Sequence, residues 1–549
     1  MKRIRFAGTW WFAALLMAAL LPKSGHGQAT PHLFRDAGRV PEMRTQSVPP
    51  TVVRQRYTNI AFDILISPSA LKKGRSVSVS GQRAVYENKE GEEREPQVDE
   101  TPSIPARLVM DLFNDALYTV ILERVENNSP DGKTLTWWGH IAEVQGGRVI
   151  LVSTDGIMSG NIRLPDGTFY QIRYAGEDLH VIREIDQRAF PPEAPPVSPG
   201  PVPPGSFDSG GGEGDLLPSG DVEGDGFSTQ DESGSTIDVM VVYTEAARMA
   251  VGGTAAMETL ILLAVNETND GYTNSGIVQR INLVHSEEVD YDENDTHSSY
   301  TDPYDIALSY LKGKSDGRMD GVHTLRDDYG ADMVSLYIDD GTWCGMAYVM
   351  YNESHDFEES AFSVIYHDCA TGYFSFAHEM GHNQGAKHDR QHSPGDGVFS
   401  YSHGYQDPEE DFRTIMSYDC PSGCDRVNHW SNPEVDYVVG GVNYGTTGVV
   451  WDDPDSADMR RSHNNTRDTV ANWRPRYIYV DQDWTGSEDG LSATPFDTLR
   501  EGVDKMAKYG KETRLYLKPD TYTGTGSTPI TITKPMEIRV WGTGGITIR

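Results

Sequence analysis

The stretch FAHEMGHNQGAKHD, from Phe376 to Asp389, holds three histidines, one glutamate and two glycines. His378 and His382 are four residues apart, so on a helix their imidazoles share one face and can bind the same ion. Glu379 points about 100° further round the helix. That position predicts that its carboxylate does not ligate the ion but reaches a water on it.

Gly385 predicts the end of this helix, because glycine readily takes the left-handed conformation at a helix C-terminus. The chain then turns back, and His388 can reach the same ion from outside the helix. Three histidines with an open fourth position are typical of a catalytic zinc site, with Glu379 as the general base. The alternative is a set of surface histidines on a helix. HExxH alone would be only moderately specific against that alternative, but the full HExxHxxGxxH motif is much more specific.

A second motif follows the third histidine. Residues Thr414 to Tyr418 read TIMSY, and Met416 fits the Met-turn that follows the long zinc motif. Such a methionine would lie beneath the metal as an apolar floor. Tyr418 is a candidate oxyanion donor or fifth ligand, and a packing role explains it equally well.

The four cysteines are Cys344, Cys369, Cys420 and Cys424. An even count suggests disulfides in an oxidising compartment, and four cysteines allow three pairings. We favour Cys344 with Cys369 and Cys420 with Cys424, since the close spacing of the second pair suits a small loop. Free buried thiols are the alternative.

Charge and the N-terminus restrict the location and the partners of the chain. The 549 residues carry 47 Lys and Arg against 82 Asp and Glu, a formal charge of -35. That balance argues against nucleic acid and anionic membranes as partners. Residues 1–29 have a basic start, a short apolar core and small residues for cleavage, which predicts a secretory signal peptide rather than a stable membrane anchor.

The composition divides the rest of the chain into four parts. Residues 30–190 predict a β-rich domain, because residues 135–184 alternate apolar and polar side chains between glycine turns. Residues 191–235 are rich in Pro, Gly, Ser and acid, which indicates an extended, protease-accessible linker. Residues 236–475 alternate strands and helices, an α/β pattern, and residues 476–549 predict a short β-rich tail with one helix.

Within the α/β part, several elements are expected before and after the histidine motif. The stretch IDVMVVYT, beginning at Ile237, has the pattern of a buried strand. The other expected elements are helices at 255–269, within 303–329 and at 457–473, and strands at 280–284 and 333–338.

Taken together, HEMGHNQGAKHD and TIMSYDC resemble the metzincin metalloproteases, and Asp389 after the third histidine is similar to the bacterial reprolysin (adamalysin) branch. The resemblance covers roughly residues 237–474. It implies a mixed five-stranded sheet over the active-site helix, zinc held by the three histidines, and a substrate edge strand within residues 344–350, namely Gly345, Met346, Ala347 and Tyr348. Tyr418 is a departure, because reprolysins usually lack a tyrosine two residues after the methionine.

The flanking regions resemble other parts of secreted enzymes. Residues 30–190 look like the propeptide of such proteases, but no cysteine precedes Cys344, so latency would need a carboxylate or steric cover; a permanently attached binding domain is the alternative. The tail looks like the first coils of a parallel β-helix. Its Asp481, Asp483 and Asp489 are candidate calcium ligands, and a solvated acidic loop explains them as well.

These observations predict a secreted zinc endopeptidase, extracellular or periplasmic, made as a zymogen. Its partners would be protein or peptide substrates, and we expect a monomer. The alternative is a secreted adhesin or carbohydrate-binding protein that acts through the tail. The intact Glu379 favours the peptidase, because a binding protein has no need of that carboxylate.

Overall fold

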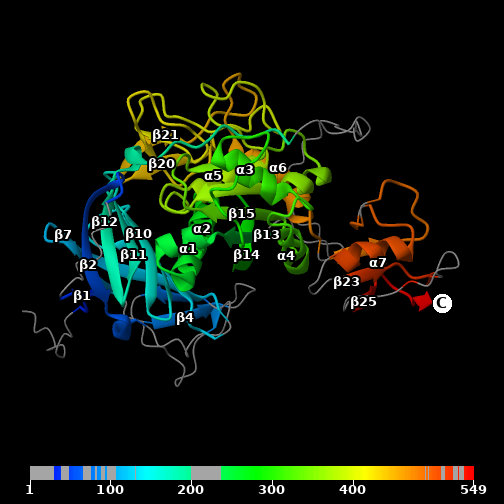
Figure 1. Ribbon diagram of the computed structural model, residues 1–549, viewed down its shortest axis with the longest axis horizontal. Coiled ribbons are helices and arrows are strands. Elements are labelled where there is room, and N and C mark those ends of the chain that lie inside the picture. The colour runs from blue at the N-terminus through cyan, green and yellow to red at the C-terminus, as the bar shows by residue number, and fades with distance from the viewer. Residues whose placement is uncertain are drawn as a thin grey trace, which may run out of the picture.

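The structure is a computed structural model in which a twelve-stranded, a five-stranded and a three-stranded β-sheet follow one another along the chain, with smaller two-stranded pairs besides (Figure 1). It describes residues 30–38, 48–65, 76–80, 83–87, 93–94, 107–129, 131–199, 236–475, 477–488, 490–492, 494–508, 514–522, 530 and 537–549. The signal-like residues 1–29 and residues 200–235 of the expected linker lie outside these ranges.

The N-terminal sheet has twelve antiparallel strands in the order β1-β2-β12-β11-β10-β9-β8-β7-β3-β4-β5, with β6 paired to β7. Alternating apolar side chains produce these strands, as expected. They are β1 (Phe34–Asp36), β2 (Val52–Ile60), β3 (Ser76–Ser80), β4 (Arg83–Glu87), β5 (Glu93–Arg94), β6 (Arg107–Phe113), β7 (Ala116–Asn127), β8 (Leu135–Ile141), β9 (Arg148–Thr154), β10 (Ile157–Arg163), β11 (Phe169–Gly176) and β12 (Leu179–Ile185). Two short 3-10 helices, η2 (Phe62–Ile64) and η4 (Gln187–Ala189), flank the sheet.

The central sheet has five strands in the order β14-β13-β15-β17-β16. All neighbours are parallel except β16, which is antiparallel to β17 and forms one edge. The mixed five-stranded sheet is therefore present as the resemblance implied. Its strands are β13 (Thr236–Tyr243), β14 (Arg280–Glu288), β15 (Met333–Ile338), β16 (Gly345–Ala347) and β17 (Phe362–Tyr366).

Helices and two short strand pairs, β18 with β19 in parallel and β20 with β21 antiparallel, complete this region. Helix α2 packs on β14, and helix α5 packs against β15, β16 and β17. The helices are α1 (Glu245–Val251), α2 (Thr254–Asn274), α3 (Pro303–Lys312), α4 (Gly321–Tyr329), α5 (Ser375–Asn383) and α6 (Met459–Ala471), with the 3-10 helix η5 (His355–Ser360). The short strands are β18 (Phe412–Arg413), β19 (Asp425–Arg426), β20 (Asp436–Val439) and β21 (Val442–Thr446).

The C-terminal part forms a small separate layer, drawn in orange and red at the right of Figure 1. Strands β22, β23 and β25 are parallel and lie side by side, and β24 pairs with β26. The tail is therefore β-rich with one helix, and its β-helix-like character stays a prediction. The elements are β22 (Tyr477–Val480), α7 (Leu499–Lys508), β23 (Arg514–Leu517), β24 (Thr521–Tyr522), β25 (Glu537–Val540) and β26 (Thr547–Ile548).

One sequence interpretation is wrong. Residues 191–199 were assigned to a free linker, but they run beside β16, and in Figure 1 they cross above the central region before the trace turns grey. The backbone amide of Ala194 donates to the carbonyl of Gly345 at 2.9 Å, and that of Val197 donates to Ala347 at 2.8 Å. Composition indicated disorder here because few large apolar groups are present; backbone pairing to an open sheet edge stabilises the segment instead.

The N-terminal sheet packs directly on the central region. Strands β9 and β10 lie against α2, and Ser159 Oγ and Thr259 Oγ1 are 2.8 Å apart across the contact. Phe190 stacks on Tyr373 with ring centroids 4.7 Å apart. The contact is therefore both polar and apolar.

Both disulfides have the favoured pairing, Cys344–Cys369 and Cys420–Cys424. The first bridge fastens the residue before β16 to the loop before α5. It also belongs to an apolar cluster with Phe169, Ile185 and Phe190 of the N-terminal part. Cys344–Cys369 therefore braces the sheet edge where the N-terminal part contacts it.

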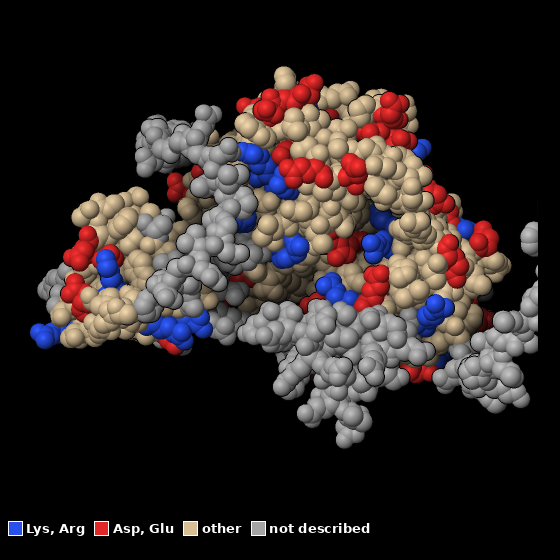
Figure 2. All heavy atoms as spheres, turned by 180° about the vertical axis from the view of Figure 1, so that it is seen from behind, with Lys and Arg blue, Asp and Glu red and all other residues tan. Residues whose placement is uncertain are grey.

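The surface mixes both signs of charge. On the face shown in Figure 2, acidic and basic side chains are interspersed over the described residues. Within the described ranges, no single helix is long and apolar enough to cross a membrane; helices α1 and α2 pass that test only as a pair, bent by 89°. Most of α2 is core, with Leu260, Ile261 and Leu263 buried.

Candidate metal centre

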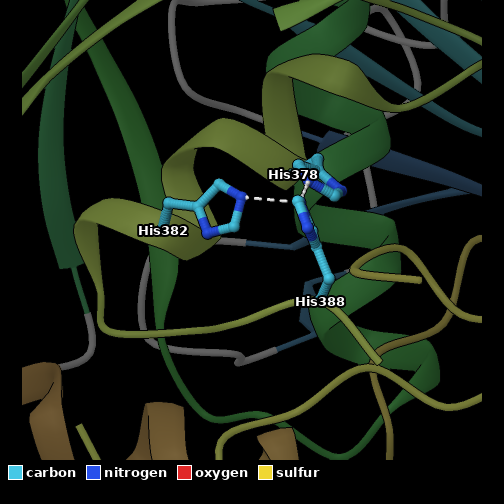
Figure 3. A group of neighbouring side chains, drawn as sticks. All are labelled: His378, His382 and His388. Carbon is cyan, nitrogen blue, oxygen red and sulfur yellow. Dashed lines mark hydrogen bonds between the residues drawn. The ribbon is translucent and has the colours of Figure 1, made fainter. Parts of the chain in front are cut away.

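Helix α5 presents the first two histidines from the interior of the protein. All nine of its residues are buried, including Phe376. The helix is followed by Gln384 and then by Gly385, whose φ of +92° is the left-handed conformation expected for the turn. The turn brings His388 back beneath the helix, as Figure 3 shows.

The three imidazoles converge through their Nε2 atoms. The Nε2 of His388 is 3.0 Å from the Nε2 of His378 and 3.1 Å from that of His382. Tetrahedral zinc with Zn–N bonds of about 2.0–2.1 Å separates its nitrogen ligands by about 3.3 Å. The cluster therefore has nearly the spacing that such an ion requires. Of the two groups of candidate metal ligands among the described residues, this one is buried.

Hydrogen bonds orient two of the rings. The Nδ1 atoms of His378 and His382 lie 2.8 Å from the carbonyl oxygens of Ile415 and Ala386. Each Nδ1 must donate to its carbonyl, which leaves each Nε2 with a lone pair that faces the cluster. Converging lone pairs repel one another unless a cation lies between them, so the donor set fits a divalent metal.

Burial keeps the imidazoles neutral, which is the form that binds a metal. Loss of solvent lowers the pKa of His378 and of His388 well below the usual value, and it lowers the pKa of His382 to about 4. Neutral nitrogen donors at the end of a buried helix suit zinc better than a hard, oxygen-binding ion.

Glu379 is fully buried and close to β16. A Cβ at Gly345 would lie 2.4 Å from Glu379 Oε1, so only glycine fits there. Neither carboxylate oxygen of Glu379 has a hydrogen-bond partner among the described residues. Burial, reinforced by Glu193, raises the pKa of Glu379. This carboxylate is free to bind a water or a substrate group.

Met416 is buried beneath helix α5 at the expected place. A Cβ at Gly381 would lie 2.6 Å from its sulfur, so this glycine allows the methionine to approach the helix between the two histidines. The ring of Tyr418 packs against that of His388, tilted by 38° with ring centroids 4.0 Å apart, and its amide donates to Asp389 Oδ2 at 3.0 Å. The roles of Met416 as a floor and of Tyr418 as an oxyanion donor stay predictions.

The edge strand is also where the sequence predicted it. Gly345, Met346 and Ala347 form β16, and Tyr348 bridges to Val197. The edge is already paired, because the described chain supplies residues 192–197 as a parallel neighbour.

Sequence reasoning missed a buried ion pair beside the metal centre. Arg426 Nη1 donates to Glu193 Oε1 at 2.5 Å, and both side chains are almost fully buried. Ser375 Oγ donates to the same oxygen at 2.7 Å. No local sequence pattern predicts this ion pair, because its members are 233 residues apart.

The calcium prediction receives no support at the residues named for it. Asp481 pairs with Lys518 at 2.5 Å and accepts from the amide of Asp483 at 3.1 Å. Asp489 lies outside the described residues. Another acidic group in the tail, Glu488 with Asp497 and Glu501, is largely exposed, and exposed acidic groups are common without an ion.

The fold and the site define a metallopeptidase, and comparisons with known proteins agree. The family model of metallo-peptidase family M12 (Reprolysin_5) matches residues 233–431. The peptidyl-Asp metalloendopeptidase of Xanthomonas campestris is 33% identical over 394 residues, 69% of this chain and 85% of the relative. That of Stenotrophomonas maltophilia R551-3 is 34% identical over 400 residues, 69% of this chain and 86% of the relative.

A shorter relative gives the same result. The peptidyl-Asp metalloendopeptidase of Pseudomonas fragi is 33% identical over 212 residues, which is 38% of this chain and 100% of the relative. The chain therefore belongs to the reprolysin-like metallopeptidases of family M12, and it is a metalloendopeptidase. Its substrates are peptides or proteins.

Proposed function

We propose that this protein is an exported zinc endopeptidase that cleaves peptide bonds next to aspartate and is made as a zymogen. The observation that carries the proposal is the buried three-histidine cluster beside the unpartnered carboxylate of Glu379. The aspartate preference comes from the names of the relatives. None of these relatives favours the alternative of an adhesin.

Each group of residues in the site has a separate role in the proposed reaction. His378, His382 and His388 would hold the zinc, which supplies a Lewis acid for water and carbonyl oxygen. A substrate lies extended along β16 and exchanges main-chain hydrogen bonds with it. Glu379 accepts the proton of the attacking water and delivers it to the leaving amine. Because no described residue donates a hydrogen bond to Glu379, its carboxylate is available for both proton transfers.

Metal removal tests the proposal. After processing, the enzyme should hydrolyse a peptide that contains one aspartate, and cleavage should fall on one side of that residue. A chelator should abolish hydrolysis, and one equivalent of zinc should restore it. Peptide products are identified by mass spectrometry. Full activity in metal-free protein would contradict the zinc centre.

The N-terminal part is well placed to keep the enzyme latent. The amide of Cys344 donates to Pro192 at 2.9 Å and that of Val349 donates to Val197 at 3.0 Å, in addition to the two bonds already described. Residues 192–197 thus take the main-chain groups that a substrate needs. We infer that cleavage within residues 200–235, followed by release of this segment, activates the enzyme.

The intact chain should accordingly hydrolyse the aspartate peptide about 100-fold more slowly than the processed chain, since a substrate cannot displace a tethered neighbour whose effective concentration is in the millimolar range. The measurement is hydrolysis before and after limited proteolysis, with the mass of each species determined. The same treatment of Glu379→Gln is the control for the added protease. Equal rates before and after cleavage would contradict latency.

Export stays a prediction. It rests on the signal-like residues 1–29 and on the two disulfides, which form in oxidising compartments. The same mass determination on protein from the culture medium shows whether those residues have been removed.

A further inference from the structure

Arg426 is a fixed, fully buried cation at the substrate edge of the enzyme. It lies in β19, just after the Cys420–Cys424 loop. Its Nη1 donates to the carbonyl of Tyr373 at 3.1 Å and its Nη2 to that of Ser417 at 3.3 Å. The guanidinium also lies 4.3 Å from the centre of the Tyr373 ring. These contacts all come from the central region, so they remain when the N-terminal part leaves.

The charge of Arg426 has one carboxylate partner within ion-pair distance in the described chain, Glu193. Ser375 Oγ, at the first position of helix α5, donates to the same carboxylate oxygen. Arg426 and Ser375 thus form a two-donor cradle for one carboxylate. We call this pair the carboxylate cradle.

Glu193 is held by the cradle and not by the metal centre. Its carboxylate is not among the ligand atoms that lie within 4.8 Å of one another in the three-histidine cluster. Its second oxygen, Oε2, is buried and has no hydrogen-bond partner among the described residues. The side chain therefore fills a site built for an acidic group beside the metal, rather than a coordination position.

The cradle is close to the reacting groups. Glu193 precedes Ala194, whose amide donates to Gly345 of β16. A Cβ added at Gly345 would in turn collide with the side chain of Glu379. Glu193 and Arg426 both interact electrostatically with Glu379. An extended peptide on β16 would therefore place a side chain in the cradle near the bond to be cleaved.

Release of the N-terminal part would leave Arg426 without Glu193, its carboxylate partner. Removing one partner of a buried ion pair is strongly unfavourable, because the remaining charge loses its counter-ion. A new carboxylate restores the pair, whereas a neutral side chain of the same shape does not. This difference is the physical basis for selecting an acidic substrate.

We propose that Arg426 and Ser375 bind the acidic side chain of the substrate next to the scissile bond, and that Glu193 occupies this carboxylate cradle before processing as an internal mimic of the substrate. The inference rests on the proposed peptidase function and assigns its specificity to particular residues. It also joins latency to specificity, since the same cradle holds the N-terminal part and selects the substrate.

The test compares two peptides that differ only in Asp or Asn at one position. We expect the processed wild type to prefer the Asp peptide by about 100-fold in kcat/KM, the size of effect found for truncation of buried charge pairs. Arg426→Gln should reduce that ratio to near one, chiefly by slowing the Asp peptide. Arg413→Gln is the matched control, because Arg413 also donates to Ser417 but not to Glu193.

A second variant covers the case in which Arg426→Gln does not fold. Ser375→Ala removes the other donor of the cradle and should lower the Asp-to-Asn ratio about 10-fold. Zinc content shows in each case that the metal centre is intact. An unchanged ratio in these cradle variants would overturn the inference and leave the peptidase function standing. Failure of the wild type to cleave either peptide would instead overturn the peptidase function.

Discussion

Glu379→Gln should reduce kcat/KM of the processed enzyme by about 10³–10⁴-fold, because general acid–base catalysis contributes up to this amount. The change removes a proton acceptor while it keeps the size of the side chain. Glu379 has no hydrogen-bond partner among the described residues, so the substitution breaks none and α5 should stay in place. The measurement is steady-state hydrolysis of the aspartate peptide.

The control is Glu245→Gln. Glu245 begins α1 and is 76% exposed, so a neutral amide there should leave hydrolysis at the wild-type level. If Glu379→Gln retained most of the activity, another group would have to be the base and the role assigned to Glu379 would be wrong.

Gly385→Ala should destabilise the protein by about 2–5 kcal/mol and weaken metal binding. Its φ of +92° is strained for any residue with a side chain. An added Cβ would also lie 2.4 Å from the Cβ of Val398 and 2.9 Å from the carbonyl oxygen of Met350. The turn would open, and His388 would move away from the other two histidines. Chemical denaturation and zinc content measure both effects.

Gly395→Ala separates the backbone strain from the collision. Gly395 has a similar φ of +89°, but nothing lies within 4 Å of the position of an added Cβ. It should therefore lose only about 1–2 kcal/mol and retain zinc. Equal losses in the two variants would show that the packing around Gly385 does not position His388.

The metal centre could be predicted from the sequence because its determinants are local. Helix periodicity places His378 and His382 together, and one left-handed glycine brings His388 to them within ten residues of the first. The central sheet was predictable for a similar reason, since stretches such as residues 236–243 are mostly apolar and become buried parallel strands.

The carboxylate cradle could not be predicted, because its parts meet only after the whole chain has folded. Glu193 lies in a Pro-rich, acidic stretch whose composition is typical of a linker. Main-chain hydrogen bonds to β16 and its flanking residues hold this stretch in place. Such bonds depend on no particular side chain, so the sequence gives no sign of them. Arg426 follows a short disulfide loop, and nothing near it in the sequence distinguishes it from a surface arginine.

The most direct test of the central claim is a joint determination of zinc content and peptide hydrolysis in matched processed preparations of wild type and Glu379→Gln. Our account predicts one zinc per chain in both proteins and hydrolysis by the wild type alone. Hydrolysis by both proteins, or a wild type that holds zinc and cleaves no peptide, would contradict it.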